Sequence, residues 1–298
     1  MKYDFSTGGN TFETTNPARP TEVVGRYSWT DEGDIAGIVA KANAAQAVWA
    51  KVPGLERAAK LDAFLDAVVA KADQIAESIA LEQGKILPEA KGETMKGATE
   101  GRFMVGEAAR MGATPIANGR PNFSNQVLRR PRGTIFCISP WNFPAMTPLR
   151  KMCPALAFGN AVIFKPSQFT PAANYMLCEI AQVFFPEGLV QMAMVSGRQA
   201  SALIASEKIQ GVSFTGSVGT GRLVGKAAAE NLIPAQLELG GKNAAILNDC
   251  DDLSDAVNQI YGAAFQTGGQ RCTSISRVLV QRDLAAEAKD LFATRAQG

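Results

Sequence analysis

The alternation of strand-like and helix-like segments between residues 134 and 230 constrains the fold most strongly. Apolar runs rich in Val, Ile and Phe occupy 134–139, 161–165, 190–195 and 211–215. The segments that follow them have the three- and four-residue apolar spacing of helices, and these run to about 158 and over 170–185, 198–206 and 218–230. Short strands that alternate with helices predict an α/β fold with a parallel sheet covered on both faces.

Polar and glycine-rich motifs follow these predicted strands, at the edge where parallel α/β sheets bind ligands. The motif G-S-V-G-T-G at 216–221 follows a strand and opens a helix, so its amides are suited to an anion. Its spacing is not the dinucleotide fingerprint, and Arg222 and Leu223 replace the Lys and Ser/Thr of a P-loop. From this motif alone, a phosphate-binding turn and a plain tight turn are both open.

The flanking regions have different patterns. Residues 31–111 have helical apolar spacing. Residues 111–133 are rich in Gly, Pro and Asn, which predicts a loop or an extended arm, with an edge strand possible at V-L-R-R. A further strand is expected at 274–281, followed by one helix to the end of the chain.

Composition excludes several kinds of chemistry. The 298 residues contain no histidine, which removes Ser/His/Asp triads, Cys/His dyads and imidazole metal ligands, and no C-x-x-C pair replaces them. We therefore expect no metal site. A net charge of +2 gives no basis for a nucleic-acid partner, and no apolar run reaches membrane-spanning length. Five scattered cysteines and no signal-peptide pattern favour a reducing, cytoplasmic location.

The five cysteines differ in their local sequence. Cys137 lies in an apolar run, Cys153 in a Pro- and Ala-rich turn and Cys178 in a helical stretch, so all three read as small buried residues. Cys250 lies among acids, which disfavour a thiolate. Cys272 follows two glycines and has an arginine beside it, a setting that favours a thiolate. On local sequence alone, a nucleophile and a partly exposed bystander are both open for Cys272.

Five motifs in order resemble one family. They are S-P-W-N-F-P (139–144), F-K-P-S-Q (164–168), F-T-G-S-V-G-T-G (214–221), L-E-L-G-G-K (237–242) and G-Q-R-C-T-S (269–274). Together they resemble the aldehyde dehydrogenase family, and N-terminal stretches such as E-Q-G-K-I-L-P-E-A agree with it. The resemblance covers essentially the whole chain.

The resemblance implies a three-layer αβα fold with a Rossmann-like cofactor domain and an α/β catalytic domain. The implied divisions are a helical part of the cofactor domain at 1–115, an extended arm of the oligomerisation type at 116–133, the Rossmann-like domain at 134–243 and the start of the catalytic domain at 244–298. Family members continue well past the cysteine, so we expect this chain to be C-terminally truncated, with an incomplete catalytic domain.

The family's chemistry needs no histidine. The resemblance implies that Cys272 attacks an aldehyde to give a thiohemiacetal, while Asn142 and a backbone amide hold the oxyanion. Hydride then passes to a nicotinamide, and Glu238 activates the water that hydrolyses the thioester. Each residue also has a structural alternative: Asn142 as a turn residue, Glu238 as a solvated carboxylate at a strand end.

The implied cofactor is NAD or NADP. Family members that favour NAD often have glutamate where this chain has Gln168. A neutral amide does not repel a 2′-phosphate, and Lys165 would attract one unless it is only a surface charge. The implied cofactor-binding residues are Ser139, Trp141, Lys165, Ser167, Gln168, Gly216, Ser217, Gly221, Leu239 and Gly240.

Arg150 suggests the kind of aldehyde. It stands where succinate-semialdehyde dehydrogenases carry an arginine for the substrate carboxylate, and a guanidinium binds a carboxylate bidentately. Gln266 stands where those enzymes carry a second arginine, so the match is incomplete. The run G-Q-R-C-T also resembles 2,5-dioxopentanoate dehydrogenases. We expect a carboxylate-bearing semialdehyde; a helix-surface role beside Lys151 is the alternative.

Two other functions are open. A truncated chain could be a non-catalytic remnant that binds nucleotide or associates with full-length subunits. Full-length members of the family are expected to form homo-oligomers. A CoA-acylating branch replaces hydrolysis by thiolysis, and Glu238 argues against it because that branch tends to lack the base.

Overall fold

The computed structural model describes residues 1–110, 112–206 and 208–297. The chain forms two compact units, Met1–Glu238 and Leu239–Gly298, and each is described by itself.

The first unit is built on a five-stranded sheet with the order β10-β9-β6-β7-β8. Strand β6 pairs in parallel with β7 and with β9, so that Cys137 lies opposite Phe164 on one side and Ser213 on the other. The strands are β6 (Thr134–Ile138), β7 (Ala161–Lys165), β8 (Val190–Met192), β9 (Gly211–Gly216) and β10 (Ala235–Leu239). The predicted parallel sheet is confirmed.

Strand β8 is shorter than the predicted 190–195. The amide of Ala193 still bonds to the carbonyl oxygen of Phe164 in β7 at 2.7 Å, but the next bond is local, from Val195 N to Ala193 O at 3.1 Å. This tight turn takes the chain out of the sheet.

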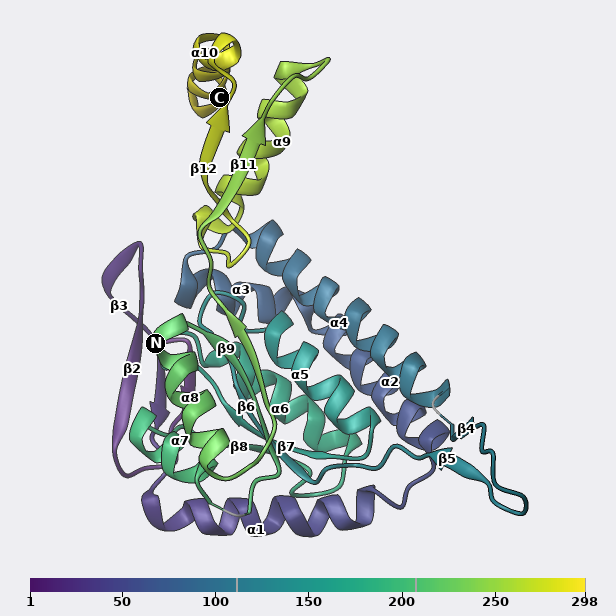
Figure 1. Cartoon of the computed structure of the whole chain (residues 1–298). Helices are drawn as coiled ribbons and strands as arrows, with labels where there is room; N and C mark the ends of the chain where they lie inside the picture. Colours follow the sequence, from purple (N-terminus) through teal and green to yellow (C-terminus); the bar gives the residue numbers. More distant parts are fainter. Residues whose placement is uncertain (111, 207, 298) are drawn as a thin grey trace. The chain divides into compact units, whose positions relative to one another are not determined.

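Helices cover both faces of the sheet (Figure 1). On one face α5 packs on β6 and β7 while α6 packs on β8, and α2, α3 and α4 lie behind them; on the other, α8 packs on β9 and α7 on α8. The bounds are α2 (Gly54–Ala70), α3 (Ala72–Gln83), α4 (Leu87–Arg110), α5 (Met146–Ala157), α6 (Ala172–Phe184), α7 (Gly197–Ile204) and α8 (Val218–Glu230). The predicted α/β class is confirmed, whereas Cys153, expected in a turn, lies in α5.

Helix α1 (Glu32–Trp49) covers the edge where the strands begin. Its Asn43 Oδ1 accepts a 2.6 Å bond from Thr134 Oγ1 at the start of β6, and Gln46 Nε2 donates to the carbonyl of Gly159, before β7, at 3.0 Å. Because β6, β7, β8 and β9 are parallel, their carboxyl ends lie together at the opposite edge, where the polar motifs that follow them are.

Two small sheets flank this core. Strands β1 (Tyr3–Phe5), β2 (Thr11–Asn16) and β3 (Arg19–Ser28) form a sheet that the prediction of a helical part over 1–115 missed. Burial alternates along β2, but its buried residues Thr14 and Asn16 are polar, so the sequence shows no apolar alternation there. Within the arm, β4 (Thr114–Ile116) and β5 (Asn125–Val127) form an antiparallel hairpin.

The second unit is a single β–α–β crossover followed by a helix. Strands β11 (Asn243–Leu247) and β12 (Ile275–Val280) pair in parallel, and α9 (Leu253–Phe265) with the 3₁₀ turn η1 (Gln266–Gly269) connects them. After the short turn η2 (Arg282–Leu284), α10 (Ala285–Gln297) closes the unit. Among the described residues, no helix combines the length and the apolar character needed to cross a membrane.

Candidate active site

The loop after β6 carries Ser139, Trp141 and Asn142 at the carboxyl edge of the sheet. The Ser139 amide bonds to the carbonyl of Lys165 at the end of β7 at 3.0 Å, and this joins the two motifs. Thr170 Oγ1 donates to the Trp141 carbonyl at 3.0 Å, while the indole is exposed. The Ser139 hydroxyl is buried and has no hydrogen-bond partner among the described residues, so a polar ligand group at this edge would satisfy it.

Two residues that were not predicted hold the main chain around Asn142, one just after α3 and one in α4. Lys85 donates to the Asn142 carbonyl at 2.9 Å, and Glu93 accepts the amides of Ala145 and Met146. Lys85 lies in E-Q-G-K-I-L-P-E-A and Glu93 lies just after it. The sequence signal that could have indicated them is a set of charged residues at positions that are buried.

The glycine turn after β9 is shaped for close approach of a ligand. Ser217 caps α8, its Oγ accepting from the Thr220 amide at 3.2 Å. A side chain at Gly216 would meet the Phe214 ring at 2.6 Å, and one at Gly219 would meet nothing within 4 Å. Gly221 is buried on the first turn of α8. A helix N-terminus at the end of a parallel strand fits a pyrophosphate.

The segment after β7 carries the predicted ribose-binding residues. Lys165 is half-buried, and burial lowers the pKa of its ammonium. Ser167 Oγ accepts from the Phe169 amide at 3.3 Å, and the Gln168 side chain is exposed. With the Ser139 hydroxyl and the α8 turn, these residues lie along one sheet edge and fit a dinucleotide.

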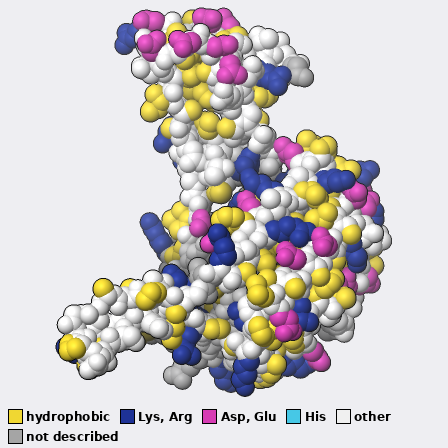
Figure 2. Space-filling view, turned by 90° about the vertical axis from the view of Figure 1, so that its right-hand side faces the viewer, with side chains coloured by type: hydrophobic (Ala, Val, Ile, Leu, Met, Phe, Trp, Pro, Cys, Tyr) yellow, Lys and Arg dark blue, Asp and Glu magenta, His cyan; other side chains and the backbone are white. Residues whose placement is uncertain are grey.

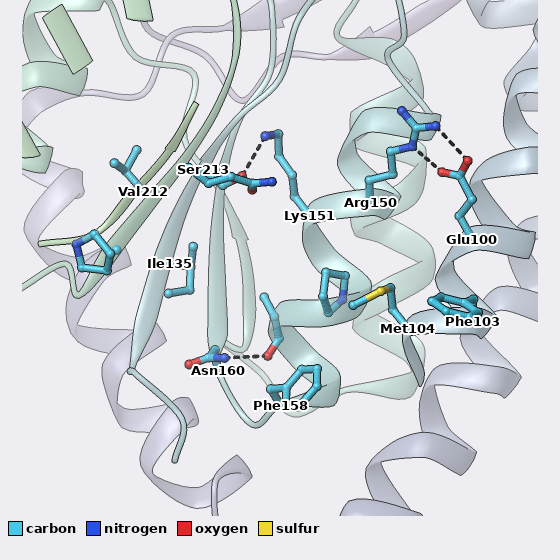
Figure 3. Close-up of a pocket in the computed structure, with 15 residues that line it drawn as sticks. Glu100, Phe103, Met104, Ile135, Arg150, Lys151, Phe158, Asn160, Val212 and Ser213 are labelled. Carbon is cyan, nitrogen blue, oxygen red and sulfur yellow. Dashed lines mark hydrogen bonds and ion pairs between the residues drawn. The ribbon is translucent and has the colours of Figure 1, made fainter. Parts of the chain in front are cut away.

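Arg150 lines a cavity of about 730 Å³ between α4, α5 and the sheet (Figure 3). Its guanidinium makes a bidentate ion pair with Glu100 of α4, with Nη2 2.8 Å from Oε1 and Nε bonded to the other oxygen. The hydrogen bonds from Arg150 lower the pKa of Glu100. Apolar side chains, including Phe103 and Met104, form another part of the lining.

Lys151 lines the same cavity and is a further candidate that the sequence analysis treated only as a neighbour. Its buried ammonium donates to Ser213 Oγ at 2.8 Å, and Ser213 donates to Gln236 Oε1 at 2.7 Å. Burial lowers the pKa of Lys151 to about 8, and attraction to Glu238 in β10 opposes the shift. The signal for it was a lysine on the otherwise apolar face of α5.

Glu238 is exposed near the end of β10, and Leu239, the last residue of that strand, is half-buried. Gly240, which follows, is exposed. Leu239 and Gly240 belong to the second unit, whereas Glu238 is the last residue of the first.

Cys272 lies in the second unit, on an exposed loop between η1 and β12. Thr267, Gly268 and Gly269 before it all have positive φ, so the chain makes a tight left-handed turn. The Asn243 side chain donates to the Cys272 carbonyl at 2.8 Å and so fixes the main chain of the thiol's own residue. Asn243 follows directly on L-E-L-G-G-K, and its role was not anticipated.

The other cysteines have different environments. Cys137, Cys153 and Cys178 are buried, and burial raises the pKa of each thiol to about 12. Cys250 is partly buried, and Cys272 is exposed. Of the five thiols, Cys272 is therefore the most open to a solution reactant.

Comparison with known proteins agrees with these motifs. The model of the "Aldehyde dehydrogenase family" matches residues 5–298. This chain belongs to the aldehyde dehydrogenase family. Its α/β fold and the order of its motifs are those that the resemblance implied.

Curated relatives of this aldehyde dehydrogenase family member include two semialdehyde dehydrogenases. The alpha-ketoglutaric semialdehyde dehydrogenase of Bacillus subtilis (strain 168) is 34% identical over 293 residues, which cover 97% of this chain and 60% of the relative. The mitochondrial succinate-semialdehyde dehydrogenase of Arabidopsis thaliana is 33% identical over 292 residues, which cover 96% and 54%.

Among solved structures, that of 3,6-anhydro-L-galactose dehydrogenase in complex with NAP has a TM-score of 0.93 and 30% sequence identity. The match covers 99% of this chain and 62% of that one. The chain thus spans between 54% and 62% of the length of these relatives.

Proposed function

We propose that this protein oxidises an aldehyde to the carboxylic acid with NAD(P)+, and that Cys272 is the nucleophile. The observation that carries the proposal is the contrast among the thiols: Cys272 is exposed after a glycine turn, and three others are buried with the pKa raised to about 12. A thiolate is the reactive form, and exposure is needed to meet a substrate.

The proposed steps assign one task to each residue. The Cys272 sulfur bonds to the carbonyl carbon, and the Asn142 side-chain amide donates to the oxygen that becomes negative. A bound nicotinamide cofactor would supply the acceptor for the hydride that leaves the tetrahedral carbon. Glu238 then takes the proton of the water that attacks the thioester, which releases the acid and the thiol; its exposed carboxylate is accessible to water.

We infer that either NAD or NADP serves as the cofactor. Lys165, Ser167 and Gln168 would hold the adenosine ribose, and the Gly216–Gly221 turn the pyrophosphate. Because the Gln168 amide is neutral, it does not repel a 2′-phosphate. The two cofactors should therefore differ by no more than about tenfold in rate, which is about 1.4 kcal/mol.

A carboxylate-bearing semialdehyde is the proposed substrate class. Arg150 offers a fork that fits a carboxylate, although Glu100 already occupies it. The side chains of this pair are 47% and 33% exposed, and exposed ion pairs contribute only about 0–1 kcal/mol. A substrate carboxylate can therefore replace Glu100 at small cost. The names of the Bacillus and Arabidopsis relatives are in keeping with this class.

We also propose that the β4–β5 arm makes a contact between copies of the chain. The hairpin and the segment after it expose Ile116, Phe123, Val127 and Leu128. Figure 2 shows hydrophobic atoms, in yellow, on the surface of the molecule. Clustered apolar side chains on an exposed hairpin are typical of an interface. Changing Phe123 and Leu128 to Ser should shift the sedimentation coefficient to that of a monomer; an unchanged value would contradict this contact.

The function is tested by titrating NAD+ and NADP+ calorimetrically beside an absorbance assay for the reduced cofactor. Cys272→Ala should leave the cofactor Kd within about twofold and abolish reduction of the cofactor. Binding without reduction by the unmodified protein would instead favour a non-catalytic nucleotide-binding role. An active Cys272→Ala variant would contradict the proposed nucleophile.

A further inference from the structure

Lys85 and Glu93 form a buried ion pair that the proposed reaction does not use directly. Lys85 follows Gly84, whose left-handed conformation (φ 83°) ends α3, and Glu93 lies in α4. Their side chains are each 1% exposed. Such a pair is a poor source of stability, because desolvation of two charges offsets much of their attraction. Its bonds to the rest of the protein suggest another purpose.

Both partners bond to the main chain of the loop that leads into α5. One Glu93 oxygen accepts the amides of Ala145 at 2.8 Å and Met146 at 3.1 Å. The other oxygen pairs with Lys85, whose ammonium also donates to the carbonyl of Asn142 at 2.9 Å. The pair is thus a polar bracket from the Asn142 carbonyl to the first turn of α5.

This bracket supplies what the loop lacks by itself. Helix α5 begins without a side-chain cap from Ala145, so Glu93 takes the place of a capping residue. The Lys85 ammonium also lies 4.1 Å from the centre of the Phe143 ring, over its face. Asn174 Nδ2 donates to the Pro144 carbonyl at 3.1 Å and holds the loop from α6.

We propose that Lys85 and Glu93 are positioning residues for Asn142. The inference rests on the proposed function, in which the Asn142 amide donates to the oxyanion. Oxyanion donors work because they are already in place when charge develops. The fixed Asn142 carbonyl, Phe143 ring and start of α5 all lie on the C-terminal side of the Asn142 side chain, and they restrict the main-chain rotations that would move it.

Amide hydrogen exchange tests the positioning without relying on activity. In Glu93→Gln, peptides covering residues 139–147 should exchange at least about tenfold faster, because a neutral amide holds the two amides less well and leaves Lys85 without its counter-charge. The matched control is Glu82→Gln. Glu82 is also a buried carboxylate that accepts an amide at a helix start, Ala172 N of α6 at 3.0 Å, but it makes no bond to this loop. The control should leave exchange over 139–147 unchanged.

A double-mutant cycle then tests whether the pair acts through Asn142. Glu93→Gln should lower kcat/KM for aldehyde oxidation about ten- to a hundredfold, mainly through kcat, since a misplacement near 1 Å costs about a hundredfold. In an Asn142→Ala background the same change should cost less than about threefold. Equal losses in both backgrounds would overturn the proposal.

A second variant covers the case in which Glu93→Gln does not fold. Lys85→Met with Glu93→Leu replaces the pair by apolar groups of similar size, a change that is often neutral for stability. Because the Ala145 and Met146 amides lose their acceptor, the melting temperature should fall moderately while the protein stays folded, and exchange over 139–147 should still accelerate. Unchanged exchange in that folded variant would overturn the positioning role. If exchange accelerates in the variant but the unmodified protein also reduces no cofactor, the positioning role is supported and the proposed function is contradicted.

Discussion

The two units of the chain differ in how they are held together. In Met1–Glu238, large side chains such as Trp49, Phe64, Phe136 and Phe164 are fully buried, and helices cover both faces of a five-stranded sheet. In Leu239–Gly298, the buried apolar core consists of Leu247, Val257 and Ala288, with partly buried side chains packed around it.

The sheet of the second unit shows the same contrast. It has two parallel strands, and Ile246 and Leu279 on them are 72% and 54% exposed. Parallel strands are normally buried on both faces, and two strands alone are marginally stable. The extensive core belongs to the unit that would bind the cofactor, whereas the proposed nucleophile belongs to the unit with the small core. The proposed nucleophile thus lies in the unit with the smaller buried core.

The largest expected difference between the units is in thiol reactivity. At pH 7 a thiol with a pKa of about 12 is roughly one part in 10⁵ thiolate. Brief iodoacetamide treatment should therefore modify Cys272 at least about a thousandfold faster than Cys137, Cys153 or Cys178. Peptide mapping by mass spectrometry measures this ratio. Faster labelling of Cys178 or of the partly buried Cys250 would break the contrast.

The next effect concerns the stability of the first unit. Burial raises the pKa of Glu82 from 4.5 to about 7, although Tyr27, Thr14 and the Ala172 amide all donate to it. The folded state favours the protonated form of Glu82. Its contribution to the free energy of unfolding is therefore complete below pH 4.5 and is lost as the pH rises through 7. Relative to Glu82→Gln, the protein should lose about 3 kcal/mol of unfolding free energy between those pH values.

Urea denaturation followed by tryptophan fluorescence is the suitable measurement. Trp29, Trp49 and Trp141 are the three tryptophans of the chain, and all lie in the first unit. Subtracting the Glu82→Gln curve removes the titration of the other groups. A difference that does not change with pH would mean that Glu82 is not held neutral in the core.

A smaller effect concerns substrate recognition by the first unit. Arg150→Leu should lower kcat/KM about ten- to a hundredfold for a carboxylate-bearing semialdehyde, because a hydrogen bond to a charged group is worth roughly 1.5–3 kcal/mol. The kcat/KM for butanal, which has no carboxylate, should barely change. The control is Glu100→Gln, which removes the carboxylate that competes for Arg150 and should not lower kcat/KM for the semialdehyde. Equal losses for both aldehydes would make Arg150 a structural residue.

Patterns local in sequence predicted most of the first unit. The strand–helix alternation gave the parallel sheet, and β7 and α8 begin and end where the apolar runs do. Strand β8 was predicted too long because Val190 to Val195 is uniformly apolar, and only the turn at Ala193 ends it. The three N-terminal strands were missed in part because β2 buries the polar residues Thr14 and Asn16, so no apolar alternation marks this strand in the sequence.

The candidate site was only partly predictable for the same reason. Motifs identify Asn142, Glu238 and Cys272 as expected chemical groups, and these roles remain predictions. Lys85 and Glu93 reach the Asn142 loop from about 50 residues away, a distance over which no local pattern reports contact. Their function depends on packing, which only the three-dimensional structure supplies.

Trapping the acyl intermediate tests the central claim most directly. Glu238→Gln should slow thioester hydrolysis about a hundredfold or more while leaving the first oxidation largely intact. Intact-protein and peptide mass spectrometry after mixing with a semialdehyde and NAD(P)+ should then find the acyl group on Cys272, and only when the cofactor is present. An adduct on another residue, or none despite a burst of reduced cofactor, would contradict the assignment of Cys272 as the nucleophile.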